Sequence, residues 1–231
     1  MSYIIWHTQI AGFGPDRADH RGLTAQLGWP DDAVVVLSLR NFQERTNLDV
    51  LVRAFARLRA ETGNARLLLA ARAGATREQI ERLVDELGLR DDVRFHRVEP
   101  EDLPALAASA DMVVTIAATD SSPSSLLEAM ASGRPLVAGF CPSIDEWVEQ
   151  GQGAEMVECR DEQAVYRAMA RLAADDALRR AYGERNARVA HERVGEAGPA
   201  LVALYRALIA GRPPHPLPLP ATASGGGAAV A

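Results

Sequence analysis

The chain has 231 residues, of which 48% are hydrophobic and 24% charged, and its formal net charge at pH 7 is −6. This composition is ordinary for a globular protein, and the acidic balance argues against a general nucleic-acid-binding surface. It leaves room for a local basic pocket that binds phosphate groups.

Predicted strands and helices alternate along most of the chain. Residues 1–31 form a weakly patterned lead-in, with a short helix that ends at Gly28 and Pro30. Short apolar runs rich in β-branched residues predict strands over residues 33–39, 65–71, 92–98, 112–118, 134–140 and 153–159. Apolar residues at helical spacing predict helices over residues 48–62, 76–87, 101–110, 124–132 and 143–151, and a helical region over 161–194.

The C-terminal part of the chain is predicted to contain helices and then a tail. We expect breaks in the helical region near Asp175 and at Gly183, and a last helix after Gly195. Residues 212–231 are rich in Pro, Gly and Ala and nearly uncharged, so we expect them to be disordered.

The alternation of apolar strands with helices predicts an α/β fold, a parallel sheet covered by helices on both faces. In such open sheets, ligands bind beyond the carboxyl ends of the strands. One domain over residues 32–211 would therefore present Arg40, Ala71–Gly74, Arg97–Glu99 and Asp120–Ser125 along one edge.

The stretch over residues 120–135, Asp120 followed by SSPSSLLEAMASGRP, is the strongest candidate for a binding site. We expect a helix after Pro123, capped by the hydroxyl of Ser121, Ser122 or Ser124, and a helix N-terminus attracts anions such as phosphate. Asp120 and Glu128 place a carboxylate on either side of this point. That layout suits a nucleotide sugar, although a serine-rich turn beside a solvated glutamate is the simpler alternative.

Two arginines add positive charge near the same edge. Arg40 directly follows the first strand and Arg45 follows a short loop, and guanidinium groups there can bind phosphate oxygens in a bidentate manner. The alternative is a pair of ordinary surface arginines.

Several segments resemble, in the same order, one glycosyltransferase family. They are VVVLSLRNFQERTNLDVLVRAFARL, GLRDDVRFHRVEPEDLPALAASADMVV, Asp120 with the following SSPSSLLEAMASGRPLVAG, and IDEWVEQGQGAEMV, and the resemblance runs over residues 31–189. This order is similar to the nucleotide-binding C-terminal half of a GT-B-fold glycosyltransferase of the retaining group-1/family-4 type. The third segment resembles the family's signature of two acidic residues followed by EAMA-x-G-x-P-V.

The resemblance implies roles for the residues that would contact the diphosphate and the sugar. Arg40 and Arg45 match the basic residues that hold the donor diphosphate, and Ser124 and Ser125 match the helix start whose N–H groups face the phosphates. Asp120 matches the first acidic position, which lies against the transferred sugar.

The resemblance also implies how the nucleoside is bound. Glu128 matches the second acidic position, which accepts hydrogen bonds from the ribose hydroxyls, and with Asp120 it is a catalytic candidate. Val98 and Glu99 fall where the family's backbone frames the nucleobase. Arginines and a helix N-terminus can stabilise a departing nucleoside diphosphate, so we expect no cofactor and no metal.

Three residue-level departures from the family pattern are visible. The first acidic residue is Asp120 rather than the commoner Glu, Arg45 replaces a Lys, and Gly74 is the one glycine in the turn after the second strand. The family's N-terminal domain, which supplies the acceptor site, has no counterpart here, and residues 1–31 would be a remnant of the interdomain connection.

Two functions are consistent with these features. The first is the donor-binding half of a retaining glycosyltransferase that transfers a hexosyl-type sugar to an unknown glycan, lipid or small-molecule acceptor. The alternative is a non-catalytic nucleotide-sugar-binding subunit that works with a separate chain carrying the acceptor domain. An epimerase is a weaker candidate, and a phosphorylase is excluded because the chain has no lysine to bind pyridoxal phosphate.

The expected location is the cytoplasm. Cys141 and Cys159 cannot make a disulfide framework, and the first ten residues do not resemble a signal peptide. Peripheral contact with the inner face of a membrane stays open.

Overall fold

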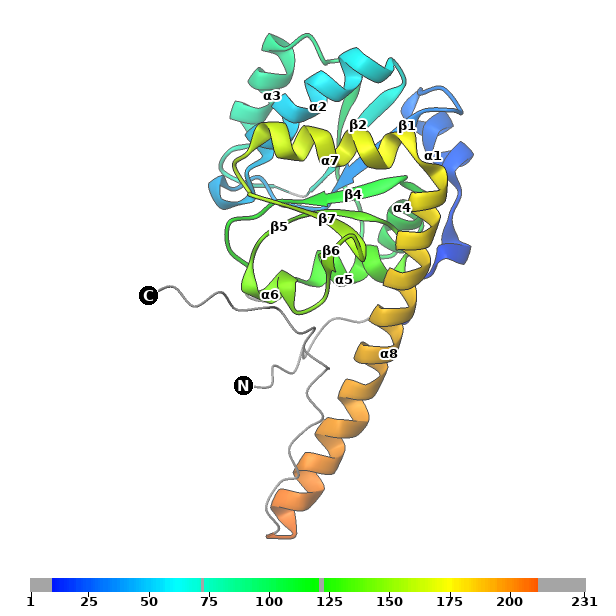
Figure 1. Ribbon diagram of the computed structural model, residues 1–231, viewed down its shortest axis with the longest axis vertical. Coiled ribbons are helices and arrows are strands. Elements are labelled where there is room, and N and C mark those ends of the chain that lie inside the picture. The colour runs from blue at the N-terminus through cyan, green and yellow to red at the C-terminus, as the bar shows by residue number, and fades with distance from the viewer. Residues whose placement is uncertain (1–9, 72, 121–122, 212–231) are drawn as a thin grey trace.

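The computed structural model describes residues 10–71, 73–120 and 123–211, and it contains one sheet of seven strands covered by helices on both faces (Figure 1). All strand pairs are parallel, and their order is β3-β2-β1-β4-β5-β7-β6. The α/β fold predicted from the sequence is therefore confirmed. The strands are β1 (Val34–Ser38), β2 (Ala65–Ala70), β3 (Val93–His96), β4 (Met112–Thr115), β5 (Leu136–Gly139), β6 (Glu149–Gln150) and β7 (Gly153–Val157).

The helices follow the strands in the predicted order. Two short 3-10 helices, η1 and η2, precede α1 and α2 respectively. Their bounds are η1 (Pro15–Arg17), α1 (His20–Leu27), η2 (Glu44–Thr46), α2 (Leu48–Thr62), α3 (Arg77–Glu86), α4 (Leu103–Ser109), α5 (Ser124–Ala131), α6 (Pro142–Asp145), α7 (Glu162–Ala174) and α8 (Asp176–Ile209).

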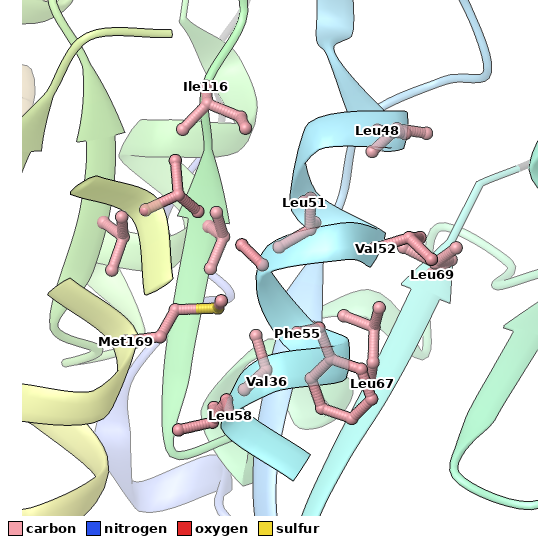
Figure 2. Close-up of a cluster of buried hydrophobic side chains, with 14 of the residues drawn as sticks. Val36, Leu48, Leu51, Val52, Phe55, Leu58, Leu67, Leu69, Ile116 and Met169 are labelled. Atoms are coloured by element: carbon pink, nitrogen blue, oxygen red, sulfur yellow. The ribbon is translucent and has the colours of Figure 1, made fainter. Parts of the chain in front are cut away.

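Each face of the sheet has its own apolar core, because alternate residues of a strand point to opposite faces. On one face, Val36 of β1 belongs to a buried cluster with residues of α2, α3 and α7, and Figure 2 shows Phe55 of α2 and Met169 of α7 in this cluster. On the other face, Leu37 packs in the cluster that contains Leu127 of α5 and residues of α1 and α4. Burial on both faces explains why the strands are apolar throughout.

The strand order creates a switch point between β1 and β4. The chain winds outward from β1 through β2 to β3, then crosses back and continues from β4 in the other direction. Loops after β1 and β4 therefore leave the sheet toward opposite faces, and ligands of open α/β sheets bind in the crevice between such loops. Arg40 follows β1 and Asp120 follows β4, so both lie at this point.

The C-terminal helical region differs from the prediction. The break near Asp175 is confirmed, but α8 runs without interruption through Gly183 and Gly195. Gly183 instead allows α8 to pack closely against the end of α5. A Cβ atom at this position would lie 2.1 Å from the carbonyl oxygen of Gly133, just after α5. The region predicted as a helix over 143–151 contains only the short α6, followed by strand β6.

The two ends of the chain fall partly outside the described residues. Leu23 of α1 and Trp29 are buried in the domain core, and the domain boundary at residue 31 stays a prediction. The predicted disordered tail, residues 212–231, lies outside the described part of the chain. The last turns of α8 extend away from the body of the domain (Figure 1). Across the described ranges, no helix combines the length and apolar character needed to cross a membrane.

Candidate functional site

Arg40 joins three elements at the switch point. Its Nη2 atom lies 2.7 Å from Oδ2 of Asp120, and its Nη1 atom donates a hydrogen bond of 3.0 Å to Oγ of Ser125 on α5. The side chains of Arg40 and Asp120 are only 12% and 10% exposed. The ion pair is thus largely screened from water, where charge interactions are stronger than at an open surface.

The N-terminus of α5 carries Ser125, the hydrogen-bond partner of Arg40. Pro123 occupies the N-cap position, and Ser124 is the first helical residue. The expectation that Ser124 caps the helix is therefore wrong, because proline takes the position that the hydroxyl would need. Ser121 and Ser122 lie outside the described residues. A helix N-terminus attracts anions, because its first N–H groups have no partner within the helix.

An apolar pocket of about 220 Å³ lies beside Arg40 and contains one carboxylate. Glu128 of α5 enters it from one side, and burial raises the pKa of this carboxyl group above its ordinary value. Two of the three predicted nucleoside-binding residues, Val98 and Glu128, therefore line one pocket. The lining residues are Leu39, Asn41, Ala70, Ala71, Val98, Pro100, Leu103 and Glu128.

Glu99 does not line this pocket. It is about half exposed and forms an ion pair of 3.3 Å with Arg97. Its neighbours Val98 and Pro100 both line the pocket, whereas the Glu99 side chain does not.

Arg45 lies on η2, in the connection between β1 and α2. Its side chain is exposed and makes an ion pair with none of the described residues. Its carbonyl oxygen accepts a hydrogen bond of 2.8 Å from the N–H of Ala118, which ties the loop after β1 to the loop after β4. Asn47 adds a second tie, since its Nδ2 atom donates to the carbonyl of Ile116 at 2.7 Å.

Gly74 allows a close approach between loops. A Cβ atom at this position would lie 2.0 Å from the carbonyl oxygen of Phe42, in the loop that carries Arg45. That same carbonyl accepts a hydrogen bond of 3.2 Å from the N–H of Thr76. Gly74 therefore helps to fix the arginine-bearing loop by direct main-chain contact.

The sequence reasoning missed Ser143, which also reaches the site. Its hydroxyl donates a hydrogen bond of 2.8 Å to the main-chain carbonyl of Asp120. Ser143 lies on α6, directly after β5, and so occupies the same edge of the sheet as the predicted residues. Its place just beyond a predicted strand was the one signal that could have indicated it.

The structure also shows a second pocket, and it shows how the possible metal-binding side chains are distributed. A second pocket of about 240 Å³ lies between the starts of α2 and α3, and its lining includes Asn47, Thr76 and Arg160. Among the residues that the structure describes, no three His, Cys, Asp or Glu side chains are grouped as a metal site would require.

Comparison with known families identifies the group of proteins to which this architecture belongs. The model of the family described as glycosyl transferases group 1 matches residues 20–189, which is most of the chain. The chain belongs to this family. The resemblance inferred from the sequence is therefore confirmed.

Relatives in this family are longer than the chain. It is 31% identical over 191 residues to the lipopolysaccharide core biosynthesis glycosyltransferase LpsE of Rhizobium meliloti, covering 82% of this chain and 53% of that relative. It is 32% identical over 206 residues to the D-inositol 3-phosphate glycosyltransferase of Corynebacterium urealyticum, covering 84% of this chain and 48% of that enzyme. The chain thus spans about half the length of these relatives.

Solved structures agree on the fold. Sucrose-phosphate synthase from Thermosynechococcus elongatus matches with a TM-score of 0.78 and 27% identity, over 90% of this chain and 52% of that enzyme. The Anabaena protein HepE, solved in complex with UDP and glucose, matches with a TM-score of 0.76 and 20% identity, over 86% of this chain and 55% of HepE. At that lower identity the match to HepE shows the fold alone.

Proposed function

We propose that the chain is the donor-binding half of a retaining glycosyltransferase, which transfers a sugar from a nucleoside diphosphate to an acceptor. The observation that carries this proposal is the placement of Arg40, which bridges Ser125 and Asp120 at the switch point of the sheet. A nucleotide sugar as donor is also consistent with the UDP and glucose bound by HepE.

In this proposal, the diphosphate binds between the arginines and the start of α5. Arg40 exchanges its contacts with Asp120 and Ser125 for phosphate oxygens, and the exposed guanidinium of Arg45 approaches from the neighbouring loop. N–H groups of Ser124 and Ser125 donate to the same oxygens, where the helix dipole favours negative charge. These groups stabilise the nucleoside diphosphate as it leaves with a growing negative charge.

The pocket beside Arg40 would hold the nucleoside. Its apolar walls, which include Val98 and Leu103, suit a flat base, and Glu128 is placed to accept hydrogen bonds from the ribose hydroxyls. A ribose diol would supply the partners that a partly buried carboxylate needs, which gives the raised pKa of Glu128 a functional reason.

Asp120 would face the transferred sugar. When the phosphate replaces Asp120 as the partner of Arg40, the Asp120 carboxylate can accept hydrogen bonds from sugar hydroxyls. Transfer with retention needs no protein nucleophile when the acceptor attacks on the face that the diphosphate leaves, because a diphosphate oxygen can take the acceptor proton. The acceptor and its binding groups would come from a domain outside this chain, as the length of the relatives suggests.

Calorimetric titration of the purified chain tests this function. The panel contains UDP-glucose, UDP-N-acetylglucosamine, GDP-mannose and ADP-glucose, together with UDP, GDP and ADP. We expect one-to-one binding of one nucleotide class, with loss of binding in Arg40→Ala. A folded chain that binds none of these ligands would contradict the proposal.

A further inference from the structure

Two parts of the fold contact Asp120, one at its carboxylate and the other at its main-chain carbonyl. Its carboxylate pairs with Arg40 after β1, whereas its main-chain carbonyl accepts a hydrogen bond of 2.8 Å from Ser143 on α6. The two contacts are chemically distinct. A phosphate can replace a carboxylate as the partner of a guanidinium, but it has no donor with which to replace the Ser143 hydroxyl at a carbonyl oxygen.

Contacts with the core and within the helix hold α6, which carries Ser143, although the helix is short. The side chain of Ile144 is fully buried in the core on this face of the sheet. The N–H of Cys141, at the N-cap of α6, lies 3.4 Å from Oδ1 of Asp145. These contacts hold Ser143 against the core.

Helix α8 contacts the two residues that directly follow α6. The guanidinium of Arg193 lies 3.9 Å from the centre of the Trp147 ring, and it donates a hydrogen bond of 2.5 Å to the carbonyl of Glu146. Trp147 itself is only 8% exposed. Asp120 is thereby linked through Ser143 and α6 to the longest helix of the domain.

We propose that Ser143 is a positioning residue for the donor sugar: its hydroxyl fixes the main chain of Asp120 while the Asp120 carboxylate changes partner from Arg40 to the sugar. This inference rests on the proposed function. When the diphosphate takes Arg40, the ion pair that orients Asp120 in the free chain is lost. The hydrogen bond from Ser143 does not involve Arg40, so it can go on holding the main chain of Asp120 in place beside the sugar.

Two ligands should differ in their dependence on Ser143. A nucleoside diphosphate has no sugar for Asp120 to contact, so its binding does not depend on where Asp120 lies. In the proposed function a nucleotide sugar does make that contact, so its affinity depends on where Asp120 lies. Loss of the Ser143 hydroxyl therefore affects the sugar-bearing ligand selectively.

The test compares Ser143→Ala, Ser143→Thr and Ser132→Ala by calorimetry, with the nucleotide sugar that the unaltered chain binds and with its nucleoside diphosphate. We expect Ser143→Ala to weaken nucleotide-sugar binding about three- to tenfold, as for loss of one neutral hydrogen bond, and to leave diphosphate binding unchanged. Ser143→Thr keeps a hydroxyl and restores the affinity. Ser132 is the matched control, because its buried hydroxyl has no hydrogen-bond partner among the described residues.

A double-mutant cycle separates positioning through Asp120 from a general structural effect. In the Asp120→Ala background, Ser143→Ala has no further effect on nucleotide-sugar affinity if the serine acts through Asp120. Additive losses, equal losses for both ligands, or no loss in Ser143→Ala would each overturn the proposal while leaving the proposed function intact. If the unaltered chain binds none of the panel, the proposed function fails and this inference fails with it.

Discussion

Strand β4 has an aspartate near each end, and the two carboxylates are bound in opposite ways. Asp111 precedes β4, and its Oδ2 atom accepts a hydrogen bond of 2.7 Å from the main-chain N–H of Val35 in β1. His20 and Arg179 lie 3.8 and 3.9 Å from its oxygens. Asp120 follows β4 and pairs with the side chain of Arg40.

This difference separates a structural carboxylate from one that is suited to binding. Asp111 is hydrogen-bonded to a main-chain N–H of the sheet, which no ligand can take without opening β1 from β4. Asp120 pairs with the Arg40 guanidinium at the switch point, and a guanidinium can bind a phosphate as well as a carboxylate. The same residue type therefore serves stability at one edge of the sheet and, in our proposal, donor binding at the other.

The largest expected effect is that of Arg40→Ala on donor affinity. Loss of charge-assisted hydrogen bonds, each contributing about 1.5–3 kcal/mol, should weaken nucleoside diphosphate binding by at least 10- to 100-fold in calorimetry. Arg188→Ala is the matched control, since it removes an exposed arginine of α8 that pairs with Glu192. Equal affinities in the two variants would show that the diphosphate binds elsewhere.

Asp111→Ala should give the second-largest effect, and only on stability. It leaves the N–H of Val35 without its acceptor, which costs about 1–3 kcal/mol and lowers Tm by roughly 2–4 °C for each kcal/mol. Asp111→Asn keeps an acceptor oxygen and should lose less. Thermal unfolding measures Tm, and titration of the folded variants should give unchanged donor affinity. If Asp111→Ala lost donor affinity while remaining folded, Asp111 would not be the purely structural carboxylate that this comparison requires.

Glu128→Gln should change stability and binding in opposite directions. Burial raises the pKa of Glu128, so the folded chain holds this proton more tightly than the unfolded chain. The charge therefore destabilises the fold above the raised pKa, and the cost disappears as the pH falls to the ordinary value of 4.5. We expect Tm of Glu128→Gln to exceed that of the unaltered chain at pH 7 and to match it near pH 4.5, with weaker nucleotide binding. A Tm difference that does not vary with pH would contradict this account.

The smallest expected effect is that of removing divalent cations. If Arg40, Arg45 and the α5 N-terminus carry the charge of the diphosphate, chelation with EDTA should leave the dissociation constant unchanged within about a factor of two. Titrations with and without added magnesium provide the measurement. A strict requirement for magnesium would show that the arginines do not suffice.

The sequence was sufficient to predict the fold and to place Arg40 and Asp120 at the same edge of the sheet. Apolar β-branched runs mark the strands, and parallel strands bring their carboxyl ends together, so Arg40 and Asp120 could be placed at one edge from local pattern alone. The family signature at residues 120–135 then indicated Glu128.

What escaped prediction depends on contacts between distant segments. The bond from Ser143 to Asp120 joins loops after two neighbouring strands, and no local pattern encodes their paths. The sequence predicts a helix break at Gly183, whereas this glycine allows α8 to approach Gly133 at the end of α5. Val98 and Glu99 lie in the loop after β3, where no regular pattern in the sequence indicates which side chain lines the pocket.

A crystal structure of the chain with its nucleoside diphosphate would test the central claim most directly. Our account predicts phosphate oxygens within hydrogen-bond distance of Arg40 and of the first N–H groups of α5, the ribose against Glu128 and the base beside Val98. It also predicts that the Arg40–Asp120 ion pair is broken while the bond from Ser143 to Asp120 persists. A diphosphate bound in the pocket between α2 and α3, with the ion pair intact, would contradict it.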